Sequence, residues 1–313
     1  MMKKVLITGG LGHIGSKLIQ EYAKREDIKE ICILDNLSTQ RYCSLFNLPE
    51  NKRYTFIEGD IFNEKELEQA IQGADIVIHL AAITDAPSTI SNSKETFRIN
   101  LEGTKKVIQA AVKAKVKKFL FPSTTSVYGE AEGLVDENYD DYKPSSPYAE
   151  SKLAAEKEVQ NAWNEYGLNT NVLRLGTIYG TSIGMRFHTA VNKFIYLACM
   201  KKPLTVWENA LDQKRPYLGL NDCIRAFDFI EINGEPGEVY NILTTNYTVR
   251  DIINTIKEFI PGVSVQLTKS PILNQKSYQV SNQKIINKGL VFKDNLSEEM
   301  GETIYLFKSI END

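Results

Sequence analysis

The fold of this chain is decided by VLITGGLGHIGS, which occupies residues 5–16. The apolar run at 5–7 predicts a strand, and the apolar spacing that starts at Ile14 predicts an amphipathic helix. The turn between them holds the residues that would lie against a pyrophosphate at the helix N-terminus, namely Gly9, Gly12, His13, Ile14 and Gly15. The stretch therefore predicts a strand–turn–helix unit that binds a dinucleotide.

A second apolar run, residues 31–34, ends in Asp35 and Asn36, with Asp35 twenty residues past Gly15. A carboxylate at this distance is placed to accept hydrogen bonds from the ribose hydroxyls of an adenosine. A 2′-phosphate would set like charges side by side, so we expect NAD rather than NADP as the cofactor. A tight turn followed by an Asx turn at Asp35 is the alternative account of these residues.

Composition and charge exclude several classes of protein. Of the 313 residues, 42% are hydrophobic and 25% are charged, which is the balance of a globular rather than a disordered chain. The net charge of -3, without a basic block, argues against nucleic acid as the main partner. Four cysteines without a C-x-x-C pair and three histidines without ligand spacing predict a reducing compartment and no metal. With no apolar run near the ~20 residues of a membrane span and no room for a signal peptide, we expect a cytoplasmic protein without a membrane partner.

Strands and helices alternate through the first half of the chain. Apolar runs predict further strands at 54–57, 75–80, 119–121 and 171–173, and helical spacing predicts helices at 64–71, 95–114 and 148–166, with a polar loop at 133–147. This alternation predicts an α/β fold with a Rossmann-type, doubly wound parallel sheet and right-handed crossovers. The alternation fades after about residue 176. We therefore expect a cofactor domain at 1–175, with returning segments around 215–245, and a smaller mixed α/β substrate domain at 176–313.

Ligands of such a sheet bind at the carboxyl ends of its strands. Asp60 and Ile61 follow one strand and would face the adenine, although Asp60 is equally well explained as a plain turn residue. Leu80, Ala81 and Ala82 follow another. The two alanines are small where a cofactor must pass near the backbone, and ordinary close packing explains them nearly as well.

One tyrosine–lysine pair has the spacing of an acid–base device. Tyr148 and Lys152 are four residues apart and so share one face of a predicted helix. A neighbouring ammonium favours tyrosinate and lowers the phenol pKa from about 10 towards neutrality. The phenol can then take a proton from a substrate hydroxyl while a hydride leaves the same carbon. A second match, Tyr139 and Lys143, lies in a loop before Pro144, where helix is disfavoured.

A hydroxyl beside the phenol would orient the substrate oxygen. Ser123, Thr124 and Thr125 come just past the strand predicted at 119–121 and offer such a hydroxyl. Simple polar turn chemistry is the alternative account of these three residues.

Taken in order, the motifs resemble those of the extended short-chain dehydrogenase/reductases, the NAD-dependent epimerase/dehydratase family that includes UDP-galactose 4-epimerase. The resemblance covers nearly the whole chain and rests on T-G-G-x-G-x-x-G, Asp35, Asp60-Ile61, His79-Leu80-Ala81-Ala82, Asn100-x-x-Gly103-Thr104, Ser123-Thr124-x-x-Val127-Tyr128-Gly129, Ser146-Pro147-Tyr148-x-x-Ser151-Lys152 and Arg215-Pro216-Tyr217. It implies that Tyr148 is the catalytic base, that Lys152 holds the nicotinamide ribose and that Thr124 supplies the hydroxyl. It also implies that Asn100 lies near the cofactor.

The resemblance extends to the substrate side. Arg215 looks like the residue that grips the diphosphate of a nucleotide sugar, a role that suits the bidentate guanidinium. The region of Arg186 and Asn192 would form part of the sugar-nucleotide cleft, and Thr84 and Thr177 would contact the substrate. Surface solvation is the alternative for both arginines. Thr177 stands where the 4-epimerases usually have Asn, which leaves the particular sugar open.

The two residues after Thr124 depart from one branch of the family. The 4,6-dehydratases carry Asp-Glu there, whereas this chain has Thr125 and Ser126. Neither hydroxyl can serve as the acid and base that remove water across C5 and C6. We therefore expect that the enzyme is not a 4,6-dehydratase. The GDP-fucose synthases use a Cys at the position of Ser126, so we do not expect 3,5-epimerisation either.

The resemblance implies NAD-dependent oxidation at C4 of a nucleotide-linked hexose or heptose. A 4-epimerase or 4-dehydrogenase of surface-polysaccharide or sugar-nucleotide biosynthesis would carry it out. The alternatives are a reductase of a 4-keto nucleotide sugar and a catalytically silent NAD sensor, against which the intact Tyr–Lys pair argues.

A homodimer is expected as well, because the helices at 95–114 and 148–166 pair across the subunit contact in the resembled family. Here these helices carry apolar residues beyond one core face: Val107, Ala110, Ala111, Ala154, Val159, Ala162 and Trp163. The alternative is that all of these residues belong to the core of one subunit.

Overall fold

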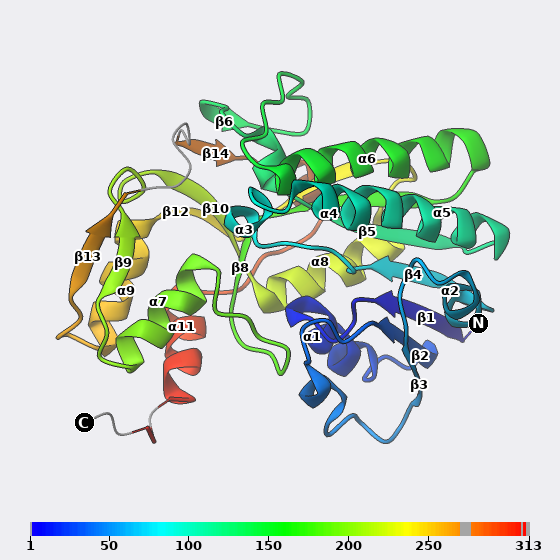
Figure 1. Ribbon diagram of the computed structural model, residues 1–313, viewed down its shortest axis with the longest axis horizontal. Coiled ribbons are helices and arrows are strands. Elements are labelled where there is room, and N and C mark those ends of the chain that lie inside the picture. Colours follow the sequence, from blue (N-terminus) through cyan, green and yellow to red (C-terminus); the bar gives the residue numbers. More distant parts are fainter. Residues whose placement is uncertain (1, 270–276, 308, 311–313) are drawn as a thin grey trace.

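A computed structural model describes residues 2–269, 277–307 and 309–310. A seven-stranded parallel sheet runs through the larger part of it, in the order β11-β7-β5-β4-β1-β2-β3 (Figure 1). Its strands are β1 (Lys3–Thr8), β2 (Ile28–Asp35), β3 (Arg53–Glu58), β4 (Ile76–His79), β5 (Lys118–Thr124), β7 (Thr170–Leu175) and β11 (Val239–Ile242). Strands β5 and β7 are buried along their whole length, as a sheet covered on both faces requires. The predicted α/β, Rossmann-type fold is confirmed.

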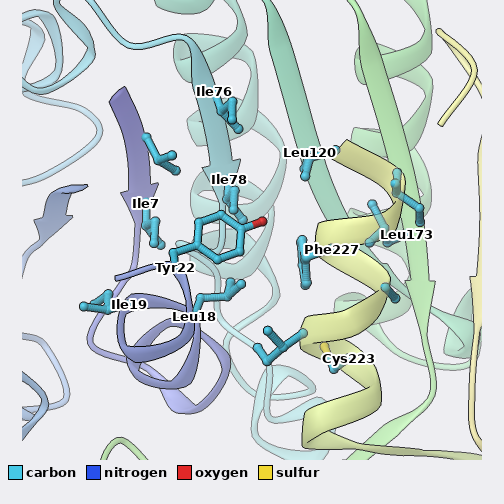
Figure 2. Close-up of a cluster of buried hydrophobic side chains, with 14 of the residues drawn as sticks. Ile7, Leu18, Ile19, Tyr22, Ile76, Ile78, Leu120, Leu173, Cys223 and Phe227 are labelled. Carbon is cyan, nitrogen blue, oxygen red and sulfur yellow. The ribbon is translucent and has the colours of Figure 1, made fainter. Parts of the chain in front are cut away.

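Helices cover the two faces of this sheet. They are α1 (His13–Tyr22), α2 (Glu64–Ile71), α5 (Thr104–Lys113), α6 (Pro147–Tyr166) and α8 (Leu220–Asn233). Helices α1 and α8 pack on one face, where Leu18, Tyr22 and Phe227 form an apolar cluster with Ile7 and Ile78 (Figure 2). Helices α2, α5 and α6 pack around a second apolar cluster on the opposite face. An apolar core therefore covers each face of the sheet.

A second group of elements lies to one side of the sheet, at the left of Figure 1. Its elements are β8 (Thr177–Tyr179), β9 (Leu204–Trp207), β10 (Lys214–Gly219), β12 (Thr245–Thr248), β13 (Val265–Thr268), α7 (Ala190–Cys199), α9 (Val249–Phe259) and α11 (Leu296–Tyr305). They enclose an apolar cluster of their own. Between β10 and β12 the chain returns to the main sheet and adds α8 and β11. The division into domains at residue 175 stays a prediction.

The helix expected at 95–114 is built from three pieces. They are α4 (Ser93–Phe97), a π-helical segment at Arg98–Gly103, and α5. The wider π turn contains Asn100, whose side-chain amide pairs with both backbone groups of Ile83. Apolar periodicity does not predict this widening, because it depends on a side-chain contact outside the helix.

The polar loop expected at 133–147 contains a short strand. This strand, β6 (Gly133–Val135), pairs in parallel with β14 (Tyr278–Val280). A three-residue strand whose partner is so distant in sequence leaves no local pattern. The remaining short elements are α3 (Ala86–Thr89), α10 (Gln283–Asn287) and 3₁₀ turns at Tyr42–Leu45 and Thr125–Tyr128. In the described ranges, no helix combines the length and apolar character needed to cross a membrane.

Candidate active site

A cleft of about 890 Å³ lies where the carboxyl ends of the parallel strands face the second group of elements. Its wall includes most of the predicted site residues: Gly9, Gly12, His13, Ile14, Gly15, Asp35, Asn36, Asp60, Ile61, Leu80, Ala81, Ala82, Thr84, Thr124, Tyr148, Lys152, Thr177, Arg186 and Arg215. Asn100 and Asn192 are not in its wall. The residues predicted for cofactor, proton transfer and substrate therefore share one cleft.

The glycine turn leaves no room for side chains. Gly9 has a φ of +65°, and a Cβ there would lie 2.6 Å from the backbone nitrogen of Ala81. A Cβ on Gly15 would lie 2.4 Å from the carbonyl oxygen of Gly10. The bare backbone at the start of α1 thus forms a cradle in which a pyrophosphate can reach the helix N-terminus.

Asp35, at the end of β2, is held by two backbone N–H groups. One oxygen accepts from Leu11 at 3.0 Å and the other from Leu37 at 2.9 Å. The Asx-turn contact with Leu37 is present, so the alternative account describes the same residue correctly without excluding a ligand. Each carboxylate oxygen keeps a further lone pair for a ribose hydroxyl. With the glycine cradle, these residues fit the adenosine and pyrophosphate of NAD.

A neutral histidine connects β1, β4 and α5 beneath the cleft. His79 Nδ1 lies 2.7 Å from Thr8 Oγ1, and Nε2 lies 3.1 Å from Thr104 Oγ1. Because the Thr104 hydroxyl donates to the carbonyl of Asn100, it accepts from Nε2–H, which leaves Nδ1 to accept from Thr8. Burial and the charge of Lys152 lower the pKa of His79 to about 3. His79 is therefore an uncharged residue whose two hydrogen bonds connect Thr8 with Thr104.

Two predicted contact residues lie behind the wall of the cleft. Asn100 binds the N–H and carbonyl of Ile83 at 2.8 and 2.9 Å and donates to Ser151 at 3.0 Å. Asn192, buried in α7, donates to the carbonyl of Arg186 at 3.2 Å. Asn100 thus acts on the wall through Ile83, whereas Asn192 Oδ1 has no hydrogen-bond partner among the described residues, and direct ligand contact by either side chain stays a prediction.

Thr124 and Tyr148 meet at the centre of the cleft. Thr124 is the last residue of β5, and Tyr148 is in the first turn of α6, which begins with Pro147 and is capped by Ser146. Both side chains line the cleft. Burial raises the pKa of Tyr148, while Thr124 and the charge of Arg186 oppose the rise.

Lys152 lies one helical turn further along α6. Its Nζ is 4.0 Å from the ring centroid of Phe121, and burial lowers its pKa to about 7. The expectation that its ammonium lowers the phenol pKa is not met here. Burial is the largest influence on both groups and disfavours the charge on each.

Two arginines reach the cleft from the second group of elements. Arg186 donates to the hydroxyl of Thr84 and so bridges to the loop after β4. Burial and the charge of Arg41 lower the pKa of Arg186 to about 10. Arg215, in β10, donates to Gln213 Oε1 at 2.9 Å, and its guanidinium lies 4.8 Å above the ring of Tyr278. Within the described ranges neither arginine forms an ion pair, so both guanidinium charges remain for a ligand.

Sequence reasoning assigned no site role to many residues of the wall, among them Arg41, Asp85, His188 and Tyr278. Arg41 lies near the glycine turn and Asp35, Asp85 directly precedes α3, and His188 lies two residues after Arg186. Tyr278, in β14, donates to the carbonyl of Thr125 at 3.0 Å. None belongs to a recognisable motif. Asp85 and His188 become noticeable only in the folded chain, where the charge of Asp85 acts on the His188 imidazole.

The solved structures to which this chain is similar include 4-epimerases. A UDP-glucuronic acid 4-epimerase from Bacillus cereus, in complex with UDP-glucuronic acid and NAD, has a TM-score of 0.89 at 27% identity, covering 97% of this chain and 99% of that one. A dTDP-glucose 4,6-dehydratase from Streptomyces venezuelae has a TM-score of 0.87 at 23% identity, covering 97% of each, and shows the shared fold.

The expectation that a 4,6-dehydratase can be excluded is wrong. The mouse dTDP-D-glucose 4,6-dehydratase is 36% identical over 267 residues, which are 82% of this chain and 72% of the mouse protein. The exclusion considered only Thr125 and Ser126. The cleft also holds a carboxylate and an imidazole, Asp85 and His188, which come from other elements.

The family itself is established by a match along most of the chain. The sequence model of the NAD dependent epimerase/dehydratase family matches residues 5–242, from the glycine turn to β11. This match contains the cradle, Asp35, Thr124, Tyr148, Lys152 and both arginines, and it confirms the expected resemblance and NAD as the cofactor. The chain therefore belongs to the NAD-dependent epimerase/dehydratase family.

Proposed function

We propose that this enzyme oxidises C4 of a nucleotide-linked hexose. The observation that carries the proposal is one cleft lined by Thr124, Tyr148 and, one helical turn further, Lys152, together with two guanidinium groups that form no ion pair within the described residues. Bound NAD supplies the hydride acceptor. A silent NAD sensor has no need of this arrangement.

The chain's own residues divide the work. Tyr148 accepts the proton of the C4 hydroxyl, and Thr124 holds that hydroxyl in line with the phenol. Lys152 binds the nicotinamide ribose. Because burial raises the pKa of Tyr148, deprotonation of the phenol depends on positive charge nearby, and Arg186 contributes such a charge.

The substrate is proposed to be a pyrimidine nucleotide sugar. Arg215 and Arg186 would bind its diphosphate, since guanidinium groups without carboxylate partners suit bidentate phosphate contacts. The names of the related proteins support the pyrimidine base: UDP-glucuronic acid in the Bacillus cereus epimerase and dTDP-D-glucose in the mouse dehydratase. Thr177, at the start of β8, would contact the sugar.

The 4-keto sugar is proposed to be reduced again from its other face, which gives the 4-epimer. The Bacillus cereus 4-epimerase, similar over 97% of the chain, supports this outcome. 4,6-Dehydration is the second candidate, and the 36% identity with the mouse dehydratase favours it. Oxidation at C4 makes the C5 proton acidic, so both reactions share the proposed first step.

The test is a panel of UDP-, dTDP-, GDP- and CDP-sugars in deuterated water. Formation of NADH absorbance on mixing identifies the accepted sugar, and mass spectrometry identifies the product. An epimer keeps its mass, whereas dehydration gives a product lighter by one water that contains solvent deuterium. Absence of NADH and of product with every sugar would contradict the proposal.

A further inference from the structure

A buried ion pair lies directly behind the proposed catalytic residues. Glu156 is one turn past Lys152 on α6, and Arg174 is in β7. The exposed fractions of their side chains are 2% and 4%. Arg174 Nε lies 3.1 Å from both carboxylate oxygens, and Nη2 lies 2.7 Å from Oε2. Further guanidinium hydrogens are donated to the hydroxyls of Tyr128 and Tyr142, so the pair is held from several sides.

A third group ties this pair to the end of β5. The hydroxyl of Ser123 donates to Glu156 Oε1, and the next residue is Thr124. Neither Glu156 nor Arg174 lines the cleft, so the pair does not touch a ligand there. It reaches the site through two neighbours, Thr124 along β5 and Lys152 along α6.

The negative charge of Glu156 also favours the protonated form of Lys152. Two titratable groups interact electrostatically with Lys152: His79 from β4 and, on its own helix, Glu156. His79 is uncharged, since burial lowers its pKa to about 3. Burial lowers the pKa of Lys152, and the charge of Glu156 is the influence that raises it.

Stability alone does not explain an ion pair at this place. Desolvation offsets much of the Coulomb attraction of a buried pair, and apolar residues often serve as well. The chain has a comparable pair far from the cleft, in which the carboxylate of Glu231, 3% exposed, binds Arg25 at 2.6 Å. Glu231 therefore offers a matched control for a buried carboxylate without a catalytic neighbour.

We propose that Glu156, held by Arg174 and Ser123, is a positioning residue that keeps Lys152 protonated and sets Thr124 against Tyr148. This inference rests on the proposed roles of Tyr148 and Lys152. No proton passes through Glu156. Its fixed charge acts on Lys152. Its hydrogen bond with the Ser123 hydroxyl acts on Thr124, the next residue of β5.

The first test measures Lys152 directly and needs no sugar substrate. Protein with lysine labelled at the ε-carbon is titrated by NMR with saturating NAD, and the Lys152 signal is assigned with Lys152→Arg. In Glu156→Gln we expect the pKa of Lys152 to fall by about one unit or more. In Glu231→Gln it should stay at the wild-type value. An unchanged Lys152 pKa in Glu156→Gln overturns the inference.

The second test uses the pH profile of turnover with a sugar accepted in the panel. In Glu156→Gln the alkaline limb of kcat should move to lower pH, with KM for the sugar little changed, whereas Glu231→Gln keeps both limbs. If Glu156→Gln does not fold, Glu156→Gln combined with Arg174→Met removes both charges and should shift Lys152 in the same direction. Failure of every sugar in the panel would sink the proposed function, yet the NMR result would still decide this inference.

Discussion

At the residue scale, the proposed chemistry depends on a phenol in a place that disfavours its charge. Burial raises the pKa of Tyr148, and the hydrogen bond with Thr124 and the charge of Arg186 oppose that rise. Tyr148→Phe keeps the ring and removes only the acid–base group. We expect turnover to fall by about 10²-fold or more, as for loss of a positioned acid or base, with folding and NAD binding retained. Steady-state kinetics and NADH fluorescence measure the two effects, and near-normal turnover would refute the role.

Cofactor choice is also a matter of single side chains. Asp35 has free lone pairs for a ribose diol, while Arg41 lies in the same part of the cleft. We expect NAD to bind at least about tenfold more tightly than NADP, because the carboxylate repels a 2′-phosphate.

Asp35→Ala should reduce the preference for NAD over NADP, because it weakens NAD binding and strengthens NADP binding. It removes the ribose acceptor and leaves the Arg41 guanidinium to pair with a phosphate. Isothermal titration with both cofactors measures the ratio, with Asp212→Ala as the control, because the Asp212 side chain pairs with Arg250 and does not line the cleft. A wild-type preference for NADP would show that Arg41 outweighs Asp35.

The site residues that could be predicted from the sequence are those whose proposed roles depend on residues nearby in the sequence. The glycine turn, Asp35 and the Tyr148–Lys152 pair each lie in one element at a fixed spacing, so their neighbours in sequence are their neighbours in space. Tyr278 reaches the cleft only because β14 pairs with β6. Neither its position nor its contact with Thr125 has a signal in the chain.

At the scale of elements, one carboxylate holds the C-terminal part of the chain to the main sheet. Asp222, fully buried in the first turn of α8, accepts from the backbone N–H groups of Lys293 and Asp294 at 2.7 and 3.0 Å and from the Thr244 hydroxyl at 2.7 Å. Arg225 pairs with it as well. The segment that leads into α11 is thus fixed to the start of α8.

Removing this carboxylate should loosen that connection. We expect Asp222→Ala to lower the free energy of unfolding by roughly 3 kcal/mol, because several buried donors lose their acceptor. Urea denaturation followed by circular dichroism measures the change. The control is Asp212→Ala, which breaks only the exposed pair with Arg250 and should leave the midpoint unchanged. Equal midpoints for both variants would show that Asp222 does not contribute measurably to stability.

Elements were predictable where one periodicity ran through them. The helix at Glu64–Ile71 has the expected bounds. The π-helical segment at Arg98–Gly103 was not predictable, because the contact of Asn100 with Ile83 decides it. Long-range contacts of this kind override local preference at the wall of the cleft.

At the scale of the whole molecule, the cleft owes its two walls to a chain that leaves the main sheet and comes back. The strand β11 lies beside β7 in the main sheet, while β10 and β12, which precede and follow this return, belong to the second group. Arg215, which is proposed to bind the substrate, reaches the cleft from β10, and β10 leads directly into α8 on the main sheet. Asp85 and His188 line the same cleft but come from different elements, so the two residues after Thr124 alone did not decide the reaction.

The outer surface of α5 and α6 bears on the predicted homodimer. Of the apolar residues expected to extend beyond the core, Val107, Ala111, Val159 and Ala162 are buried within the subunit. Ala110, Ala154 and Trp163 keep exposed surface. The prediction of a dimer therefore depends on these three residues and on the polar side chains between them.

We expect light scattering to give twice the subunit mass of 35.4 kDa at micromolar concentration. Ala154 lies on the outer side of α6, so Ala154→Arg would force two guanidinium groups against each other across a symmetric contact and should give a monomer with unchanged circular dichroism. Ile232→Arg is the control, because Ile232 is 70% exposed on α8, on the opposite face of the sheet, and the variant should remain dimeric. A wild-type protein of subunit mass would refute the dimer, and a dimeric Ala154→Arg variant would place the contact elsewhere than on α5 and α6.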